Sequence, residues 1–400
     1  MNEPKLINGR DIYWIGVNDR ETDLFEGLWP LPRGVSYNSY LIADEKTVLL
    51  DTVKGNSAIP FTEKVRLVIG ERPLDYLVVN HMEPDHSGAL KLMLELHPRL
   101  QLVGNAKTAR FLADFYGITE RIQVVEDGET LRTGRHELQF HFVPMVHWPE
   151  TMVTHDRTDR VLFSMDAFGG FGALDGGIFD DEVDIDYYED ESLRYFSNIV
   201  GKYSAMVQKA IQKLGGLELA VVAPTHGPIW RKDPARIVGL YDRWSRHVAE
   251  PGVVIAYGSM YGNTERMMDA VAQGIQEAGF GKVRIHNVSR SHLSYILRDA
   301  WRFSSVVLGS PAYDQDIFPP MESLLRLLAA KKLRNRTLGI FGNFAWSGGA
   351  VSRLQAFAEE VAWPLAGPVV EAKCAPKPAD LEGCRKLGRE LVGRIRAGGG

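Results

Sequence analysis

The hexapeptide His81-Met82-Glu83-Pro84-Asp85-His86 constrains this chain of 400 residues more than any other feature. It places four strong metal ligands within six residues, directly after an apolar run at residues 76–80. A buried carboxylate without a partner is very costly, so a segment that keeps two of them needs cations to face them. We expect an extended strand-to-helix loop on which His81, Glu83 and Asp85 project the same way, with His86 beside them.

Three further candidate ligands, His147, Asp166 and His226, lie at or just after the ends of apolar runs at 137–143, 160–164 and 219–223. Strands that end in ligands at one edge predict a layered α/β domain with its site at the rim of a sheet. Imidazole and carboxylate without thiolate suit iron or manganese better than structural zinc. Seven ligands exceed the need of one ion, so the sequence predicts a two-metal site.

The chain divides by pattern into two expected domains, residues 1–250 and 251–400. In the first, further strands are expected at 35–42 and 47–51, a helix at 88–96, and a connecting helix at 234–248. In the second, expected strands at 253–257, 304–309 and 337–341 alternate with expected helices at 264–278, 321–328 and 351–361. This alternation predicts an open, doubly wound parallel sheet.

Composition narrows the class of protein. The two cysteines, Cys374 and Cys384, indicate neither a disulfide framework nor a thiolate cluster. The polar N-terminus lacks the apolar core of a signal peptide, and no apolar run approaches the length that spans a bilayer. We therefore expect a soluble cytoplasmic protein that does not associate with membranes.

Charge is unevenly distributed along the chain. Residues 1–250 carry a net charge of −11 and residues 251–400 carry +6, within a total of −5. One interpretation is solvated surface. The other is that the basic half docks against something acidic, either the first half of another subunit or an acidic carrier protein. No basic tract interleaved with aromatic residues argues for nucleic acid.

Three loops of the second half follow its expected strands. The first, at 259–264, has hydroxyls at both ends, a glycine and a helix start, which favours binding of an anion such as a monophosphate. Such loops are also common helix caps, so this signal alone is weak. Loops at 309–314 and 342–350 each supply an aromatic residue and exposed backbone suited to a flat heterocycle. The alternative for Tyr313 and Trp346 is packing in the core.

The spacing His-x-Glu-x-Asp-His, followed by His147, Asp166 and His226, resembles the metallo-β-lactamase fold in its flavodiiron protein version. Hydrolases of that fold usually have His where this chain has Glu83, and a carboxylate there favours iron over zinc. The resemblance implies that His81, Glu83 and His147 hold one iron, that Asp85, His86 and His226 hold the other, and that Asp166 bridges them. In some members of that family the counterpart of His86 turns away from the metal.

Further segments are similar to the same family. Residues 36–40 resemble its early strand, and residues 225–230 its last ligand loop. Tyr195 matches a tyrosine near the metals of relatives. Glu26 stands where some relatives have a histidine facing the site, which leaves the preference for O2 or NO open. For Tyr195 and Glu26 the alternative is ordinary packing and solvation.

The three loops of the second half resemble those of flavodoxin, which binds FMN. The resemblance implies an N-terminal αββα metallo-β-lactamase-like sandwich followed by a flavodoxin-like parallel sheet. Ala312 and Asp314 stand where relatives more often have Thr and Asn, so ring contacts there are expected to differ. The flavin contacts that it implies are Ser259, Met260, Tyr261, Gly262, Asn263, Thr264, Pro311, Ala312, Tyr313, Asp314, Gly342, Asn343, Phe344, Ala345, Trp346, Ser347, Gly348 and Gly349.

The resemblance implies a terminal oxidoreductase of the simplest, two-domain kind, which reduces O2 to water, NO to N2O, or both. It would serve detoxification in an anaerobe or microaerophile. Rubredoxin or another small carrier would supply electrons to FMN, and a head-to-tail homodimer or dimer of dimers would bring FMN near the two iron ions. Two alternatives stay open at this point: a zinc-dependent hydrolase fused to a flavodoxin domain, and a non-catalytic electron carrier.

Overall fold

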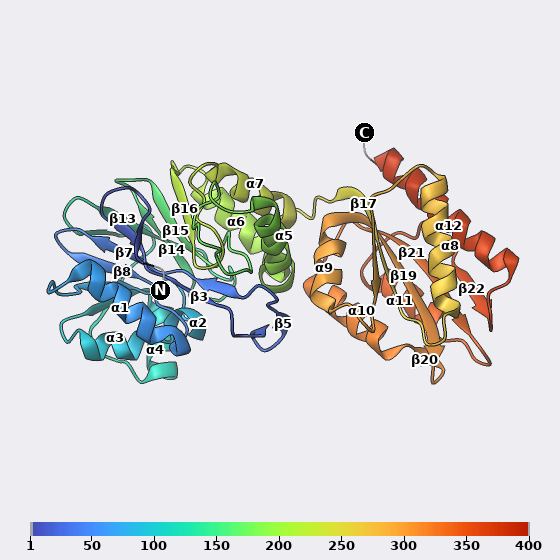
Figure 1. Ribbon diagram of the computed structural model, residues 1–400, viewed down its shortest axis with the longest axis horizontal. Helices are drawn as coiled ribbons and strands as arrows, with labels where there is room; N and C mark the ends of the chain where they lie inside the picture. Colours follow the sequence, from blue (N-terminus) through green and yellow to red (C-terminus); the bar gives the residue numbers. More distant parts are fainter. Residues whose placement is uncertain (1–2, 399–400) are drawn as a thin grey trace. The chain divides into compact units, whose positions relative to one another are not determined.

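The computed structural model describes residues 3–398, which separate into two compact units (Figure 1). The first unit runs to Phe196 and includes Tyr203–Asp242, and the second comprises Ser197–Lys202 and the chain from Arg243 onward. This division lies earlier than the proposed boundary after residue 250, and it assigns one short segment of the first half to the second unit. Within residues 3–398, no helix has both the length and the apolar character needed to cross a membrane.

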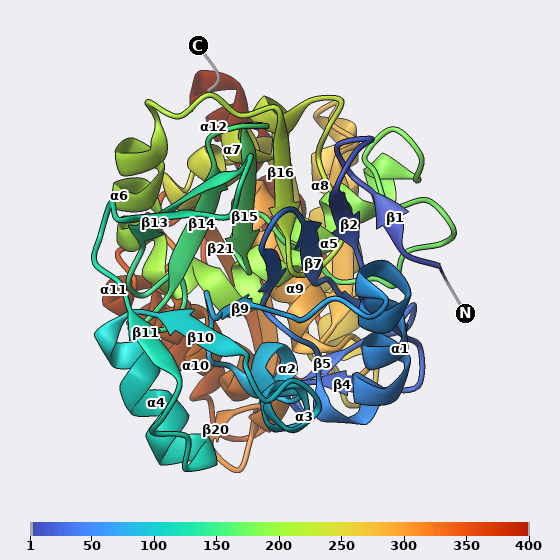
Figure 2. The ribbon, with the colours of Figure 1, turned by 90° about the vertical axis from the view of Figure 1, so that its left-hand side faces the viewer.

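Two β-sheets form the centre of the first unit. The seven-stranded sheet has the order β1 (Lys5–Leu6), β2 (Ile12–Trp14), β7 (Tyr40–Ala43), β8 (Thr47–Leu50), β9 (Tyr76–Val78), β10 (Gln101–Gly104), β11 (Ile122–Val124). The five-stranded sheet has the order β12 (Thr130–Arg132), β13 (Glu137–Phe142), β14 (Met152–Asp156), β15 (Val161–Met165), β16 (Val221–Pro224). Figure 2 shows β13 to β16 side by side in this order.

Helices cover the outer faces of this pair of sheets (Figure 1). One group is α1 (Ala58–Ile69), α2 (Pro84–Ser87), α3 (Leu90–Leu96) and α4 (Ala106–Tyr116), and the other is α5 (Ile185–Tyr195), α6 (Ser204–Leu214) and α7 (Pro234–Ser245). Two small hairpin-like pairs, β3 (Val17–Asp19) with β6 (Val35–Tyr37) and β4 (Leu24–Phe25) with β5 (Trp29–Pro30), lie outside the sheets. Short helical turns occupy Gly55–Ser57, Phe196–Val200 and Gly201–Tyr203.

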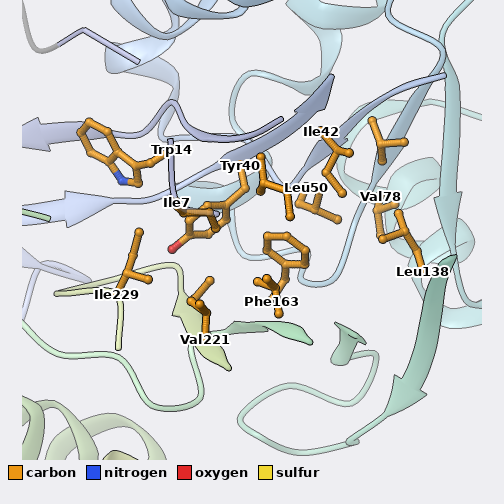
Figure 3. Close-up of a cluster of buried hydrophobic side chains, with 14 of the residues drawn as sticks. Ile7, Trp14, Tyr40, Ile42, Leu50, Val78, Leu138, Phe163, Val221 and Ile229 are labelled. Atoms are coloured by element: carbon orange, nitrogen blue, oxygen red, sulfur yellow. The ribbon is translucent and has the colours of Figure 1, made fainter. Parts of the chain in front are cut away.

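The inner faces of the two sheets share one hydrophobic core (Figure 3). Ile42 and Leu50 of the first sheet and Leu138 and Phe163 of the second are all buried there. The Tyr40 ring packs against Phe163 with centroids 5.3 Å apart. Each fully buried side chain of this size contributes about 1.5–3 kcal/mol, so the core fixes the sheets whose rims carry the candidate ligands.

The single strand expected at 35–42 is wrong, because the structure divides it into β6 and β7. Asn38 lies at the break and bonds to Trp14 Nε1 at 2.8 Å and to the carbonyl oxygen of Gly227 at 2.8 Å. Ser39 donates to the carbonyl oxygen of Leu50 at 3.1 Å. These buried polar side chains need partners on three segments, so the backbone cannot continue straight through one sheet.

The second unit contains a parallel sheet in the order β18 (Val283–Asn287), β17 (Glu250–Tyr257), β19 (Phe303–Tyr313), β21 (Thr337–Phe344), β22 (Val370–Lys373), with β20 (Asp316–Ile317) antiparallel to β19. Helices α8 (Asn263–Glu277) and α12 (Pro378–Gly398) cover one face, and α9 (Leu293–Arg302), α10 (Pro319–Lys331) and α11 (Ala350–Glu360) the other (Figure 1). In chain order this is 2-1-3-4-5, the flavodoxin-like arrangement. The expected doubly wound sheet is confirmed.

Candidate metal centre and flavin site

Four loops at the rim of the first unit bring the predicted metal ligands together. His81 follows β9, His147 follows β13, Asp166 directly follows β15, and His226 follows β16. The expected extended hexapeptide is wrong beyond Glu83, because Pro84–Ser87 forms α2. Proline at the first helical position is well suited to start a helix there, since it needs no backbone donor. The turn separates Glu83 from Asp85, and the two carboxylates enter different ligand groups.

The first ligand group comprises His81, Glu83, His147 and Asp166. Glu83 Oε2 lies 3.2 Å from both His81 Nε2 and His147 Nε2. Asp166 Oδ2 lies 3.3 Å from His81 Nε2 and 3.1 Å from His147 Nε2. All four residues are buried, so this group of four donor atoms could hold one metal ion.

The second group comprises Asp85, His86 and His226. Their facing atoms lie close together: His86 Nε2 is 3.1 Å from His226 Nε2, and Asp85 Oδ2 is 3.2 and 3.3 Å from these two nitrogens. The other oxygen of Asp166, Oδ1, lies 2.9 Å from His86 Nε2 and 3.3 Å from His226 Nε2. Asp166 therefore offers one carboxylate oxygen to each group.

The donor atoms fit a pair of hard to borderline cations. Both carboxylate oxygens of Asp85 are buried, and no residue in the described range 3–398 hydrogen-bonds to them. Burial lowers the pKa of His226, but the carboxylates of Asp166 and Asp85 outweigh it and raise that pKa to about 10. Three carboxylates and four imidazoles without thiolate match iron or manganese. Two metal ions would neutralise the negative charge that these three carboxylates concentrate in the protein interior.

Buried residues to which the sequence assigned no role orient these ligands. Glu150 Oε1 accepts a hydrogen bond from His81 Nδ1 at 2.8 Å, and the carbonyl oxygen of Ser36 accepts one from His226 Nδ1 at 2.8 Å. Protons on Nδ1 leave the Nε2 lone pairs free to bind metal. Thr225 Oγ1 donates to Asp166 Oδ1 at 2.7 Å, and Asp51 accepts the backbone N–H of His81 at 3.3 Å. The available signal was a polar residue directly after a buried strand, as at Asp51.

His86 is turned toward the other ligands in this structure. Its Nε2 lies within the second group, but its Nδ1 is buried and makes no hydrogen bond within the part of the chain that the structure describes. His81 and His226 have such an outer partner. His86 is thus the least firmly oriented of these three imidazoles.

A hollow of about 610 Å³ opens beside the two ligand groups. Glu83 and Asp85 line it together with Glu26, and the apolar residues Phe25 and Leu28 complete one side. Loss of solvent contact and the nearby Glu83 carboxylate raise the pKa of Glu26 to about 7. Trp29 Nε1 donates to Glu26 Oε2 at 3.0 Å. Glu26 therefore lies where it faces anything that enters the hollow.

Tyr195 packs against His226 of the second ligand group. Its ring centroid is 5.5 Å from that of His226 and 6.0 Å from that of Phe25. Its hydroxyl is buried and has no hydrogen-bond partner among the described residues. Burial and the Asp166 carboxylate raise its pKa well above the usual value, so the phenol keeps its proton at neutral pH.

A third cluster of possible ligands, Asp11, His136 and Asp159, lies elsewhere in the first unit. Arg135 Nη2 already lies 3.0 Å from Asp11 Oδ1 and 2.5 Å from Asp159 Oδ2. The guanidinium neutralises these carboxylates, so this cluster is an ion-pair network rather than a metal site.

The predicted flavin contacts surround a cavity of about 500 Å³ at the carboxyl ends of the second unit's strands. Its volume lies in the usual range for small-molecule sites. Trp346 is 81% exposed, so it does not pack in the core, which was the alternative to flavin contact. The predicted residues that line the cavity are Met260, Tyr261, Asn263, Pro311, Ala312, Tyr313, Asp314, Asn343, Phe344, Ala345, Trp346 and Ser347.

The remaining predicted contacts do not line the cavity themselves. Ser259 Oγ accepts the backbone N–H of Gly262 at 3.1 Å, and Thr264 Oγ1 donates to Asn343 Oδ1 at 2.6 Å. Gly262 has φ of 85° and precedes α8, whose first turn has no side-chain cap. An uncapped helix start attracts an anion, which fits a phosphate group. Gly342 lies within β21, near its carboxyl end, and Gly348 and Gly349 directly precede α11.

Gln315, Cys374 and Ala375 also line the cavity, although the sequence did not indicate them. Cys374 and Ala375 follow β22, a strand that was not foreseen. The rule that ligands bind beyond the carboxyl ends of parallel strands would have found this fourth loop once β22 was recognised.

Comparison with known proteins agrees with both expected folds. The family profile described as ODP family beta lactamase matches residues 35–227, and the flavodoxin profile matches residues 255–388. The anaerobic nitric oxide reductase flavorubredoxin of Escherichia coli O1:K1 / APEC is 36% identical over 393 residues, which cover 97% of this chain and 82% of that protein. The rubredoxin oxygen:oxidoreductase from the anaerobe Desulfovibrio gigas matches with a TM-score of 0.93 at 28% identity, over 99% of both chains.

The flavodiiron protein from Giardia intestinalis matches with a TM-score of 0.93 at 27% identity, over 99% of this chain and 98% of that one. The chain belongs to the flavodiiron protein family. This membership confirms the expected fold class and the expected cofactors, FMN and a non-haem diiron centre. The relatives are named as oxidoreductases, which supports an enzyme and favours neither the zinc hydrolase nor the non-catalytic carrier.

Proposed function

We propose that this protein reduces O2 to water, NO to N2O, or both, at a non-haem diiron centre that receives electrons through FMN. The observation that carries the proposal is the position of Asp166, which presents Oδ2 to one ligand group and Oδ1 to the other. A shared carboxylate places two metal ions side by side, at a spacing that lets both contact a diatomic substrate.

The ligand assignment follows the two groups. His81, Glu83 and His147 would hold one iron ion, Asp85, His86 and His226 the other, and Asp166 would bridge them. When bound, the iron pair and reduced FMN supply two electrons each, which suffices for O2 to two waters, while two electrons couple two NO into N2O and water. The flavin would occupy the cavity lined by Tyr313 and Trp346, with its phosphate at the start of α8.

The chain's own residues would handle protons and access. The Tyr195 phenol keeps its proton and has a hydroxyl free to donate to a substrate bound beside His226. Glu26, with a pKa of about 7, can hold or release a proton at the hollow near neutral pH. Phe25 and Leu28 give the hollow an apolar side, which suits small apolar gases and limits bulk water.

The electron donor and the assembly are further parts of this proposal. Relatives named for rubredoxin support rubredoxin or a similar small carrier as the donor. A head-to-tail homodimer, or a dimer of dimers, would place the FMN of one subunit near the iron pair of another, which the net charges of −11 and +6 on residues 1–250 and 251–400 would favour. We also propose a cytoplasmic location. A monomer in solution with full turnover would contradict the dimer.

An anaerobic stopped-flow experiment tests the activity. The fully reduced protein is mixed separately with O2 and with NO, while flavin absorbance and gas consumption are followed. Rapid reoxidation by either gas, in protein with two irons per chain, supports the proposal. Loading of two zinc ions, or reduced protein that consumes neither gas, would overturn it.

A further inference from the structure

Four aromatic side chains form a cluster that starts at a candidate iron ligand and ends at the protein surface. Phe111, Phe115 and Tyr116 lie on α4, and Trp148 directly follows His147; these four residues are termed the α4 aromatic cluster. The Trp148 ring centroid lies 6.1 Å from that of Phe111 and 6.3 Å from that of Phe115, the latter pair stacked at 27°. Phe115 is exposed, so the cluster reaches solvent.

Trp148 also contacts His81, a candidate ligand of the metal centre. Its ring lies edge-on to the His81 imidazole, with centroids 5.3 Å apart and planes at 89°. His81 Nε2 points into the first ligand group, and Trp148 itself is half-buried. Indole is among the most easily oxidised side chains, whereas phenylalanine is not. Within the α4 aromatic cluster, Trp148 is therefore the oxidisable ring in contact with a candidate ligand.

We propose that Trp148 is a redox-active residue that gives one electron toward the diiron site when O2 reduction runs short of electrons. This inference rests on the proposed function. Full reduction of O2 to two waters takes four electrons, and dioxygen that has received fewer stays a strong oxidant beside His81. Trp148 loses one electron and its indole N–H proton, which passes to water. The oxygen-derived oxidant gains that electron and a proton from solvent.

The product at Trp148 is a neutral indolyl radical, which the next electron and proton from the carrier-fed flavin restore to tryptophan. The surrounding phenylalanines shield one side of the ring from water and cannot compete for the oxidising equivalent. Coupling of NO to N2O leaves no comparably strong oxidant. The radical is therefore specific to O2, and Trp148 would protect the ligand set from oxidative damage.

The decisive measurement is freeze-quench EPR on protein that carries two iron(II) ions and oxidised FMN, mixed with excess O2. The wild type should give an organic radical that narrows when ring-deuterated tryptophan is incorporated, which a flavin radical would not do. Trp148→Phe with unchanged iron content should lose this signal, and Trp148→Tyr should replace it with a tyrosyl signal. Phe111→Leu, which loosens the same packing but keeps the indole, should retain it.

Mass spectrometry after many turnovers gives an independent readout. Hydroxylated or ring-opened products should accumulate at Trp148 under O2 and not under NO. Added catalase and superoxide dismutase are the control for freely diffusing oxidants, and the modification at Trp148 should persist in their presence. Loss of the Trp148 modification when catalase and superoxide dismutase are present, or an unchanged radical in Trp148→Phe, would overturn the proposal while O2 consumption continues. Absence of any gas consumption would instead overturn the proposed function.

Discussion

His81 Nδ1 donates to Glu150 Oε1 at 2.8 Å, and the same oxygen accepts the backbone N–H of Met82 at 2.9 Å. Glu150 is 1% exposed, so both bonds lie in the protein interior. One carboxylate oxygen therefore fixes the imidazole tautomer and the backbone of the hexapeptide together. The orientation of His81 toward the first ligand group depends on this contact.

Two replacements of Glu150 should weaken iron binding to different extents. Glu150→Gln retains an oxygen that can accept both bonds, whereas Glu150→Leu removes the acceptor and leaves two buried donors unpaired. We expect iron affinity in Glu150→Leu to fall by about 10–100-fold, and less in Glu150→Gln. Iron content after dialysis against graded chelator measures this. Equal losses in the two variants would show that charge rather than hydrogen bonding matters.

Asp166→Asn should uncouple the two ligand groups. An amide cannot present two anionic oxygens, so we expect fewer than two irons per chain and a loss of gas reduction larger than the ~10–100-fold typical of an outer partner. Metal analysis and stopped-flow rates check this. Thr225→Val, which removes the hydrogen bond to Asp166 Oδ1, is the matched control and should retain both irons. Two irons bound with normal affinity in Asp166→Asn would refute the bridging role.

Tyr195→Phe separates a structural role from a chemical one. The buried hydroxyl has no hydrogen-bond partner in the described chain, so its removal should leave the free energy of unfolding unchanged or slightly higher. If the hydroxyl donates to the substrate, turnover should fall about 10-fold or more while iron content stays constant. Urea unfolding and steady-state rates test the two effects. Wild-type turnover would mean that the phenol takes no part.

Trp346→Ala should weaken FMN binding without destabilising the apoprotein. The ring is 81% exposed, so little packing is lost when it is removed. Loss of a stacking partner costs about 0.5–1.5 kcal/mol, which corresponds to roughly 2–10-fold in the dissociation constant. Quenching of FMN fluorescence during titration provides the measurement. An unchanged dissociation constant would place the ring system elsewhere in the cavity.

Stability should rise between about pH 8 and 10.5 because of Lys64. Burial lowers the pKa of this lysine from 10.5 to about 8, so in this window the unfolded chain binds more protons than the folded one. The hydrogen bond from Lys64 Nζ to the carbonyl oxygen of Gly16 favours the charged form, so the gain should be smaller than the full pKa difference implies. Urea unfolding at several pH values should show this gain for wild type relative to Lys64→Met. Parallel pH profiles of the two proteins would contradict it.

The ligand types and their approximate place could be predicted from the sequence because each follows an apolar strand. The hexapeptide itself was only partly foreseen. Its first half is a loop that follows β9, but Pro84 begins a short helix, and periodicity over so few residues does not distinguish an extended loop from a single turn. The division of Glu83 and Asp85 between two groups follows from that turn.

The second unit was predicted where its strands are buried on both faces, as in β17, β19 and β21. The edge strand β18 was missed because all its residues are half-buried or exposed, and β22 was missed because only two of its four residues are buried, so neither gives an apolar run. Without β22, the loop with Cys374 could not be assigned to the flavin cavity. The residues Glu150 and Ser36 were missed because their partners lie far away in the chain.

The sequence by itself determined the donor types of the candidate metal site, the order of the two folds, and the hydroxyl and glycine residues of the loop before α8. These are properties of residue type and local spacing. Tertiary structure alone decided that Asp166 faces both ligand groups, that Glu150 fixes His81, and that Trp148 touches His81. Such contacts join segments that only the packing of two sheets brings together, and no local pattern records which loops will meet at their shared rim.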